Sequence, residues 1–208
     1  MAVQSDYRYS LTVNGSSQFE VVRFVLKEHL STLFRLELDL ASFGAEPNFH
    51  SLIDQPATLT FWQGDEAVRS VNGIVTALNQ GETGFTRTRY HMVIEPSLCR
   101  AGLQTDLRIF QQQDSQKIIE TLLSKNQVSQ SQFHLQTPYW TREYCVQYRE
   151  TDLNFIQRLA AEEGSYYYFE HTNNSHILHF SNSTTLSEKK GNLVYNAMPA
   201  GQRPEAAV

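Results

Sequence analysis

Apolar and polar side chains alternate with a period of two along much of the first hundred residues, and this pattern restricts the possible folds more than any other feature. Successive side chains of a β-strand point to opposite faces, so the pattern predicts half-buried strands. The alternation covers residues 7–13, 34–40, 57–62 and 90–95, and Asn14-Gly15 after the first segment predicts a hairpin turn. Several short strands separated by turns indicate a β-sandwich or a barrel.

The apolar pattern takes the period of an amphipathic helix after Pro96. Asp114 and Ser115 are N-cap candidates for a first short helix. Its apolar side chains fall on one helical face at Ile118, Ile119, Leu122 and Leu123. The fold of this region is therefore expected to differ from that of the first hundred residues.

A second helix follows, and strands are expected on both sides of it. Thr151 or Asp152 can cap its N-terminus, and Gly164 can end it by adopting the left-handed backbone conformation. Its apolar stripe consists of Leu153, Ile156, Leu159 and Ala160. The expected strands are residues 144–148 before the helix and a hairpin over residues 166–180 after it. We therefore predict an α+β subdomain with two short helices.

The charge and the cysteine content limit the kinds of partner and the cellular compartment that we expect for this chain. The chain of 208 residues has a formal net charge of −5, and its 17 basic residues are dispersed apart from Lys189-Lys190, so we expect no nucleic acid partner. Cys99 and Cys145 form no metal-ligand motif, which fits synthesis in a reducing cytoplasm. We find no signal peptide pattern and no apolar run of ~18 residues, so we expect no membrane insertion.

The histidines do not suggest a metal site. His176 and His179 are the closest pair, with His171 near them across the expected hairpin. Residues three apart on a strand point to opposite faces, so this pair cannot chelate one ion. We predict no metal and no cofactor.

The acidic residues do not suggest an active site either. Glu150 with Asp152, and Glu162 with Glu163, are the crowded acids. Adjacent helical residues do not face each other, and an acid in the first turn of a helix favours the helix dipole. The chain also lacks the GxSxG, HExxH, GxxxxGK[ST] and GxGxxG motifs. We therefore predict no catalytic residue and a protein that is not an enzyme.

The aromatic run Tyr166-Tyr167-Tyr168-Phe169 is the strongest candidate for a contact surface. Strand alternation sends Tyr166 and Tyr168 to one face and Tyr167 and Phe169 to the other, so the four rings cannot form one flat platform. Aromatic side chains are enriched at protein interfaces. We predict that the four residues contact a protein partner.

Two segments resemble the VgrG family of type VI secretion spike proteins. The first is Glu95-Pro96-Ser97-Leu98 followed by Arg108-Ile109-Phe110-Gln111. The second runs from Val146 to Phe155, continues to Glu162-Glu163-Gly164 and ends at residues 167–171. Its motif positions, which we expect to be structural, are Gln147, Tyr148, Arg149, Glu150, Asp152, Leu153 and Gly164. Ser165 and Tyr166 depart from the family, which more often has an aliphatic residue and Trp there.

The resemblance implies a phage tail hub-like β-barrel plus a smaller α+β subdomain. Residues 1–98 would form the first hub barrel, residues 99–182 the α+β subdomain, and residues 183–208 a linker and the start of an incomplete second barrel. The abrupt end of the chain suggests a fragment of a longer protein.

The resemblance also implies a structural role in a contractile injection machine. The full-length protein would be a homotrimer that docks on the Hcp tube and carries downstream needle domains and effectors. It would be made in the cytoplasm and then secreted or injected by the type VI machine. This region alone is expected to trimerise weakly or not at all.

Three alternatives remain open. A phage or pyocin tail hub shares the fold. A β-barrel peptidoglycan hydrolase would need a pocket with convergent acids. A carbohydrate-binding module would need at least two coplanar exposed rings.

Overall fold

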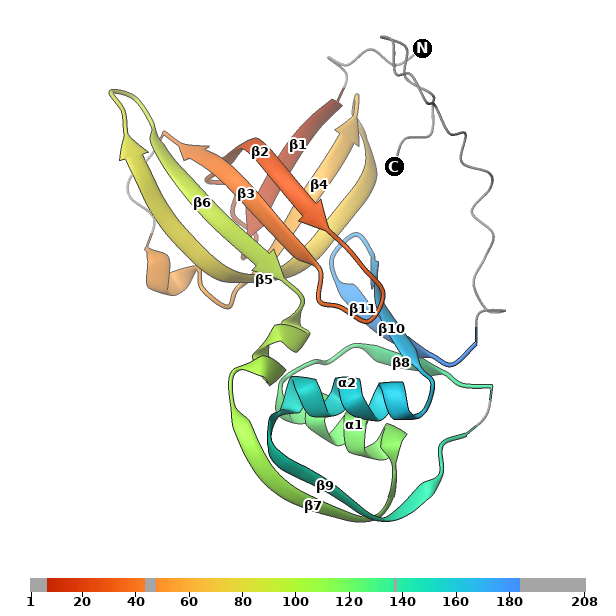
Figure 1. Cartoon of the computed structure of the whole chain (residues 1–208). Coiled ribbons are helices and arrows are strands. Elements are labelled where there is room, and N and C mark those ends of the chain that lie inside the picture. The colour runs from red at the N-terminus through yellow and green to blue at the C-terminus, as the bar shows by residue number, and fades with distance from the viewer. Residues whose placement is uncertain (1–6, 44–47, 137, 184–208) are drawn as a thin grey trace, which may run out of the picture.

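The computed structural model describes residues 7–43, 48–136 and 138–183, which form two packed units (Figure 1). The first unit is a six-stranded sheet with strand order β1-β4-β5-β6-β3-β2 and antiparallel neighbours throughout. Its strands are β1 (Tyr7–Val13), β2 (Glu20–Lys27), β3 (Arg35–Ser42), β4 (Pro56–Gln63), β5 (Glu66–Thr83) and β6 (Thr88–Glu95). A short 3-10 helix, η2 (Phe49–Ser51), precedes β4.

This sheet curls so that its two edge strands approach each other, and we call it the curled sheet. The ring centroids of Tyr9 on β1 and Phe24 on β2 are 5.0 Å apart, and Phe61 on β4 lies against both rings. The inward side chains of the alternating strands fill the interior, with Leu36, Leu38 and Leu59 fully buried. The predicted alternation therefore supplies the core of this unit.

The second unit is an α+β unit that surrounds two helices. A 3-10 helix, η3 (Ser97–Gly102), leads from the curled sheet into it. Its elements are β7 (Thr105–Asp114), α1 (Ser115–Lys125), β8 (Ser131–His134), β9 (Thr141–Thr151), α2 (Asp152–Glu162), β10 (Tyr166–His171) and β11 (His176–Ser181). Strands β7 and β9 form a two-stranded antiparallel ribbon, and the other sheet has the order β10-β11-β8. Side chains from both sheets and both helices share one core.

The helix boundaries follow the capping signals of the sequence. Asp114 caps α1 by accepting from Lys117 N at 2.8 Å, and Thr151 caps α2 by accepting from Asn154 N at 3.1 Å. Gly164 has a φ of +67° just after α2. These observations confirm the predicted starts of both helices and the glycine that ends the second.

The loop between β2 and β3 and the β10–β11 hairpin join the two units, and we call these contacts the joint. Ser31, which has a φ of 54°, donates its backbone N–H to the carbonyl of Tyr167 at 2.8 Å. Phe34 packs edge-on against Phe169 and His176, with ring centroids 5.3 Å and 5.9 Å apart. A backbone hydrogen bond and ring contacts therefore join the two units.

Asn72 on β5 completes the joint because it holds the turn of the β10–β11 hairpin. Its side-chain Nδ2 donates to the carbonyls of Thr172 at 2.6 Å and Ser175 at 3.0 Å. Its Oδ1 accepts from Thr58, and its backbone N–H donates to Nδ1 of His171. All the polar groups of this buried side chain are therefore used.

Three of the sequence predictions can be compared with the structure here. The turn at Asn14-Gly15 is present and Val13 and Ser16 form one antiparallel bridge across it, so the predicted start of a hairpin is confirmed. The bridge does not continue into pairing with β2, because the partner of β1 in the sheet is β4, in the register Tyr9↔Phe61. The predicted strand segments 7–13, 57–62 and 90–95 are strands in the structure, and so are residues 35–40 of the predicted segment 34–40. The prediction of a mainly β fold is therefore confirmed. The expected start of a second barrel after residue 183 lies outside the described residues, and the domain boundaries stay predictions.

Replacing Gly73 with Ala should unfold or severely destabilise the curled sheet. A Cβ at this position would lie 2.6 Å from both the Glu95 carbonyl oxygen and Ile94 Cγ2, so the backbone of β6 would have to move. We expect a loss of about 3 kcal/mol or more in the free energy of unfolding, measured by urea denaturation. Gly81→Ala is the control on the same strand, because its Cβ would meet Arg89 at an ordinary 3.6 Å. Equal stability of the two variants would contradict this account.

The joint should weaken as the pH falls, through His176. Burial, and then the neighbouring His171, lower the pKa of His176 from 6.5 to about 4. The unfolded chain therefore binds this proton more tightly, and the stabilisation is complete above pH 6.5 and is lost as the pH falls toward 4. We expect His176 to account for a loss of about 2 kcal/mol between pH 7.5 and pH 5.

The measurement is urea unfolding of the wild type and of His176→Gln at both pH values, because other groups also titrate in this range. The variant should lose less stability than the wild type on acidification. The same pH dependence in both proteins would rule out the assignment to His176.

Candidate functional site

The outward face of the β7–β9 ribbon carries a continuous row of exposed apolar side chains. Leu107 pairs with Tyr148, and Ile109 pairs with Val146, across the two strands. Tyr144 extends the row by one pair, opposite Gln111. These five apolar residues, Leu107, Ile109, Tyr144, Val146 and Tyr148, are 44–65% exposed, and we call them the apolar strip.

The strip is the largest concentration of exposed apolar groups in the part of the chain that the structure describes. Fourteen large apolar side chains are exposed there, and half of them lie in the strip or at its two ends, where Leu103 is 79% exposed and Trp140 is 81% exposed. The five strip residues present on the order of 500 Å² of surface, which is at the upper end for a monomer. A surface of this kind indicates a protein contact.

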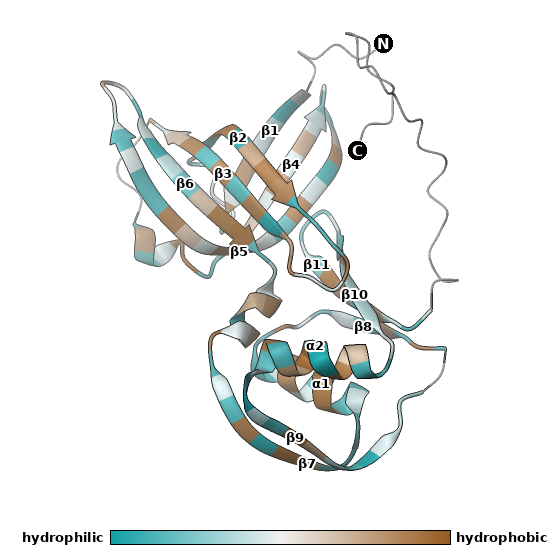
Figure 2. Cartoon of the chain, in the orientation of Figure 1, coloured by the Kyte–Doolittle hydropathy of each residue, from teal (hydrophilic) through white to brown (hydrophobic). Residues whose placement is uncertain are grey.

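The inward face of the same ribbon is buried on the helices. Phe110, Cys145 and Gln147 point to the core, where Phe110 lies 5.8 Å from Phe155 of α2 between ring centroids. Figure 2 shows the resulting bands of hydrophilic and hydrophobic colour along β7. The core uses one face of the ribbon, so the apolar residues of the other face have no partner within the unit.

Asp152 anchors the ribbon to the helices through a buried polar network. Gln147 on β9 donates to its Oδ1 at 2.8 Å, and Asn126 after α1 donates to its Oδ2 at 2.9 Å. Arg108 on β7 and Lys125 on α1 approach the same carboxylate at 3.3 and 3.2 Å. Two of the VgrG-like motif residues, Gln147 and Asp152, are therefore structural in this chain.

Arg149 and Tyr148 differ from Gln147 and Asp152, because both are exposed motif residues. The ladder passes from Glu150↔Asp106 to Tyr148↔Leu107, so Arg149 is the extra residue of a β-bulge, with a φ of 50°. Its guanidinium lies 5.4 Å from the centroid of the Tyr148 ring, and it forms no ion pair within the described part of the chain. A bulge re-aims a side chain, and here it places a free cation beside the strip.

The crowded acids of the sequence are held in ion pairs. Glu150 binds Arg158 at 2.6 Å, and Glu162 binds Arg158 and Arg142. Glu163 binds Arg142 at 2.7 Å. All four crowded acids therefore have an arginine partner, Asp152 through Arg108 at 3.3 Å, so these carboxylates do not converge on a pocket.

The aromatic hairpin is divided between the core and the surface. Tyr167 is 1% exposed and lies in the core of the α+β unit, where Gln157 donates to its hydroxyl at 2.8 Å. Phe169 belongs to the joint. Tyr166 and Tyr168 stack on the opposite face with ring centroids 6.3 Å apart. Tyr166 and Tyr168 are partly exposed and accessible to a partner, whereas Tyr167 is buried and is not accessible.

Histidines extend the ring row of Tyr166 and Tyr168 across the three-stranded sheet. The ring of Tyr168 stacks on His179, and Nδ1 of His179 lies 2.9 Å from Nε2 of His134. Nε2 of His179 faces Glu170 at 2.8 Å, so its two nitrogens serve different partners. His176 lies in the joint instead, as strand alternation predicts. No three His, Cys, Asp or Glu side chains of the described residues are placed to hold one metal ion.

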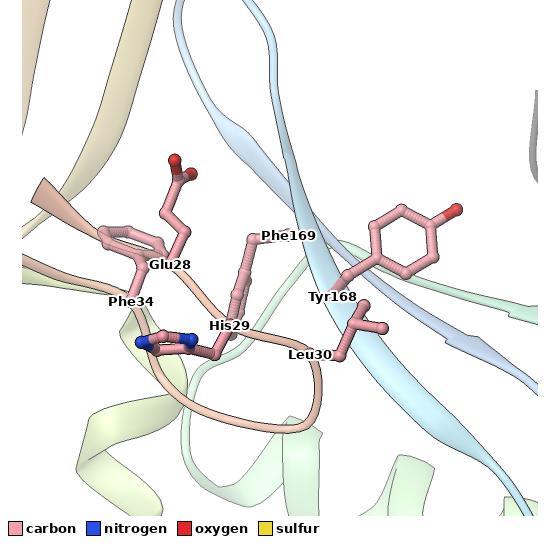
Figure 3. Close-up of a pocket in the computed structure, with 6 residues that line it drawn as sticks. All are labelled: Glu28, His29, Leu30, Phe34, Tyr168 and Phe169. Atoms are coloured by element: carbon pink, nitrogen blue, oxygen red, sulfur yellow. The ribbon is translucent and has the colours of Figure 1, made fainter. Parts of the chain in front are cut away.

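A pocket of about 270 Å³ lies at the joint, between the β2–β3 loop and β10. Figure 3 shows that Phe169 points toward Phe34, whereas Tyr168 points to the other side of its strand. Leu30 and His29 complete the wall, and Glu28, the acid that lines it, binds Arg69 at 2.6 Å. The pocket is formed by the joint and does not gather catalytic groups.

These features define a β-rich module with one exposed apolar face. Residues 27–208 match the family described as the phage tail baseplate hub (GPD). The chain therefore belongs to the phage tail baseplate hub family, in its VgrG branch. It is 38% identical to the type VI secretion system spike protein VgrG2a of Pseudomonas aeruginosa over 205 residues, which is 97% of this chain and 24% of VgrG2a. It is 40% identical to the spike protein VgrG3 of Vibrio cholerae over 170 residues, or 81% of this chain and 17% of VgrG3.

Solved structures agree with this assignment. The E. coli c3393 protein is a component of the type VI secretion system with structural similarity to the T4 tail proteins gp27 and gp5. It matches with a TM-score of 0.79 and 25% identity, over 86% of this chain and 50% of that protein. The 43 kDa tail protein of prophage MuSo2 from Shewanella oneidensis shares the fold with a TM-score of 0.55 and 12% identity, over 83% of this chain and 53% of its own. The predicted tail hub-like fold is confirmed.

Replacing Asp152 with Ala should destabilise the whole α+β unit. The change removes a buried acceptor from Gln147 and Asn126, while Arg108 and Lys125 keep Asp106 as a partner, so we expect a loss of about 1–3 kcal/mol in the free energy of unfolding. Glu162→Ala is the control, because its carboxylate is 39% exposed and its loss should cost less than about 1 kcal/mol. Thermal unfolding followed by circular dichroism measures both. Similar costs for the two changes would show that the network is not the anchor.

Proposed function

We propose that the chain is the hub portion of a type VI secretion spike, a structural part that acts by binding other proteins. Its similarity to spike proteins along 97% of its length carries this proposal. The ion-paired acids and the apolar strip support it, because they offer a contact surface and no gathered catalytic groups. The chain spans about a quarter or less of the spike proteins it matches, so the activity of the whole protein is part of the proposal.

The partners follow from the proposed role. The complete protein would be a homotrimer, dock on the Hcp tube and carry needle domains and effectors. Tyr166 and Tyr168, together with the apolar strip, are the candidate contacts of this region. Its secretion would depend on the type VI machine, and no helix in the described ranges has the length and hydropathy to cross a membrane.

A phage or pyocin tail hub remains the alternative function. The likeness to the prophage tail protein favours a shared fold, at 12% identity. The identities of 38% and 40% to spike proteins favour the secretion system. A tail hub would also act by protein contacts, so the site described above would keep its role.

The chain should replace the corresponding region of a spike protein in a working secretion system. In a P. aeruginosa strain without VgrG2a and VgrG2b, we would express VgrG2a with its matching 205-residue region exchanged for this chain. We expect the chimera to restore release of the tube protein Hcp into the medium, measured by immunoblot of the supernatant.

The matched control is the same chimera carrying Gly73→Ala, which should be unable to fold its hub and should release no Hcp. Absence of release from a chimera that accumulates to the normal level in cells, as a folded protein, would count against the proposed function.

A further inference from the structure

Two histidines on neighbouring strands are hydrogen-bonded to each other on one face of the β10-β11-β8 sheet. Nε2 of His134 on β8 lies 2.9 Å from Nδ1 of His179 on β11, and 16° separates the planes of the two rings. His179 is only 4% exposed. The other face of the sheet packs into the core of the α+β unit, where Phe133 stacks on Phe180. The histidine pair therefore lies on the face that points away from that core.

The partners of the two rings assign their protons. Nε2 of His179 lies 2.8 Å from a carboxylate oxygen of Glu170, and an ionised carboxylate can only accept a hydrogen bond. Nε2 of His179 therefore carries the hydrogen, and Nδ1 of the neutral ring has a lone pair. The hydrogen between the two rings must then come from Nε2 of His134. At neutral pH both histidines are in the Nε2–H form.

The pair can take up one proton and keep its hydrogen bond, but it cannot take up two. When His179 is charged, its Nδ1–H donates to Nε2 of His134, whose own hydrogen is then on Nδ1. A second proton charges His134 as well, so that two N–H groups on like charges face each other across the 2.9 Å contact. Glu170 lies beside the charged His179, whereas His134 forms no ion pair with another described residue. The second proton therefore breaks the contact.

We propose that the His134–His179 pair holds β8 on the sheet and releases it when both histidines are charged. β8 has four residues, lies at the edge of the sheet and pairs with β11 in parallel, which is the less stable form of pairing. Beside the strand, the Gln130 carbonyl accepts from Leu178 N at 3.1 Å, and Gln136 N donates to the side chain of Asn182 at 2.8 Å. Loss of the histidine contact removes a large part of so short an attachment.

The β10–β11 hairpin stays in place, because its contacts do not depend on the second proton. Besides His134, the titratable groups that face His179 in the described residues are Glu170 and Tyr168 on β10. Tyr168 stacks on His179 with ring centroids 4.9 Å apart, a contact that a charge on His179 strengthens. Burial lowers the pKa of His179 and raises the pKa of the Tyr168 hydroxyl, so the tyrosine stays neutral in acid. Asn72 also holds the hairpin turn.

Release of β8 changes what this sheet can bind. The edge of β11 that β8 covers becomes free, and a free edge can pair with a strand of another protein chain. The device goes beyond the proposed spike function and does not depend on it, because the isolated chain should show it.

The pH range follows from the ordinary pKa of histidine. A released histidine has a pKa of about 6.5, so at pH 5 its charged form exceeds its neutral form about thirtyfold. The attached pair cannot hold the second proton, so attachment is fully favoured above pH 6.5 and is lost as the pH falls below it. We expect the ratio of released to attached β8 to rise about ten- to thirtyfold between pH 7.5 and pH 5.

The first test is amide hydrogen exchange of this chain at pH 7.5 and pH 5, with each rate divided by the intrinsic rate at the same pH. The protection of the paired amides of β8 should fall about ten- to thirtyfold on acidification. His134→Gln keeps a donor for Nδ1 of His179 and cannot be charged, so its β8 should stay protected at pH 5. His91→Gln, on β6 with a histidine side chain that is 45% exposed, is the matched control and should respond as the wild type does.

The amides of α1 serve as an internal reference in the same experiment. They exchange through unfolding of the whole α+β unit, so they also report the acid response of His176. Their protection should change equally in the wild type, His134→Gln and His91→Gln. The difference between the wild type and His134→Gln at β8 then measures the release of this strand alone.

The second test reads the proton positions directly. Long-range proton–nitrogen NMR spectra of the labelled chain at pH 8 should show both His134 and His179 in the Nε2–H form. The Nδ1 nitrogen of His179 should also lose its hydrogen bond in a His134→Ala variant.

Three results would each overturn the proposal. The first is equal protection of β8 at the two pH values, and the second is a His134→Gln variant whose β8 loses as much protection as that of the wild type. The third is His134 in the Nδ1–H form at pH 8, because the proton assignment would then be wrong. Release of Hcp by the chimera has no bearing on any of them, so the two proposals fail separately.

Discussion

The side chain of Asn72 fixes the relative position of the two units, and the orientation of every surface depends on it. Its partners on the β10–β11 turn lie 100 and 103 residues further along the chain. Loss of these partners would leave a buried amide unpaired and lower the free energy of unfolding by about 1–3 kcal/mol. One position of the hairpin on β5 is therefore favoured. The Ser31 contact and the rings of Phe34 and Phe169 then hold the hairpin along its length. The ribbon on the far side of the helices is thereby placed relative to the curled sheet (Figure 1).

The same strand periodicity has different consequences in the two units. In the curled sheet the apolar face of each strand closes on the apolar faces of the others, so alternation produces a core. In the ribbon both faces of β9 are largely apolar at the centre, because Cys145 points inward while Tyr144 and Val146 point outward. The helices can cover one face of a sheet only, so the second apolar face becomes the strip.

Local signals in the sequence predicted the elements whose structure is decided locally. The caps Asp114 and Thr151 and the ending at Gly164 need a few neighbouring backbone groups, and all three were predictable. β5 was not predicted, because its central residues from Val71 to Val75 are buried on both faces, between the core and the joint, and show no alternation. The pairing of β1 with β4 was missed because a turn sequence reports a change of direction and carries no information on a partner 50 residues away.

The candidate site was predictable to a smaller extent. The alternation of Tyr144, Val146 and Tyr148 revealed β9, and the same pattern in Leu107 and Ile109 could have revealed β7. Which face of such a strand is covered depends on the helices packed beneath it, and that is a tertiary property. Tyr167 shows the converse case, since a residue in an aromatic run suited to an interface fills the core instead.

The strip constrains how such a protein can be handled before assembly. Burying its surface is worth about 25 cal/mol per Å², so several kcal/mol favour any partner that covers it. An unprotected strip on a two-stranded ribbon would promote aggregation as readily as assembly.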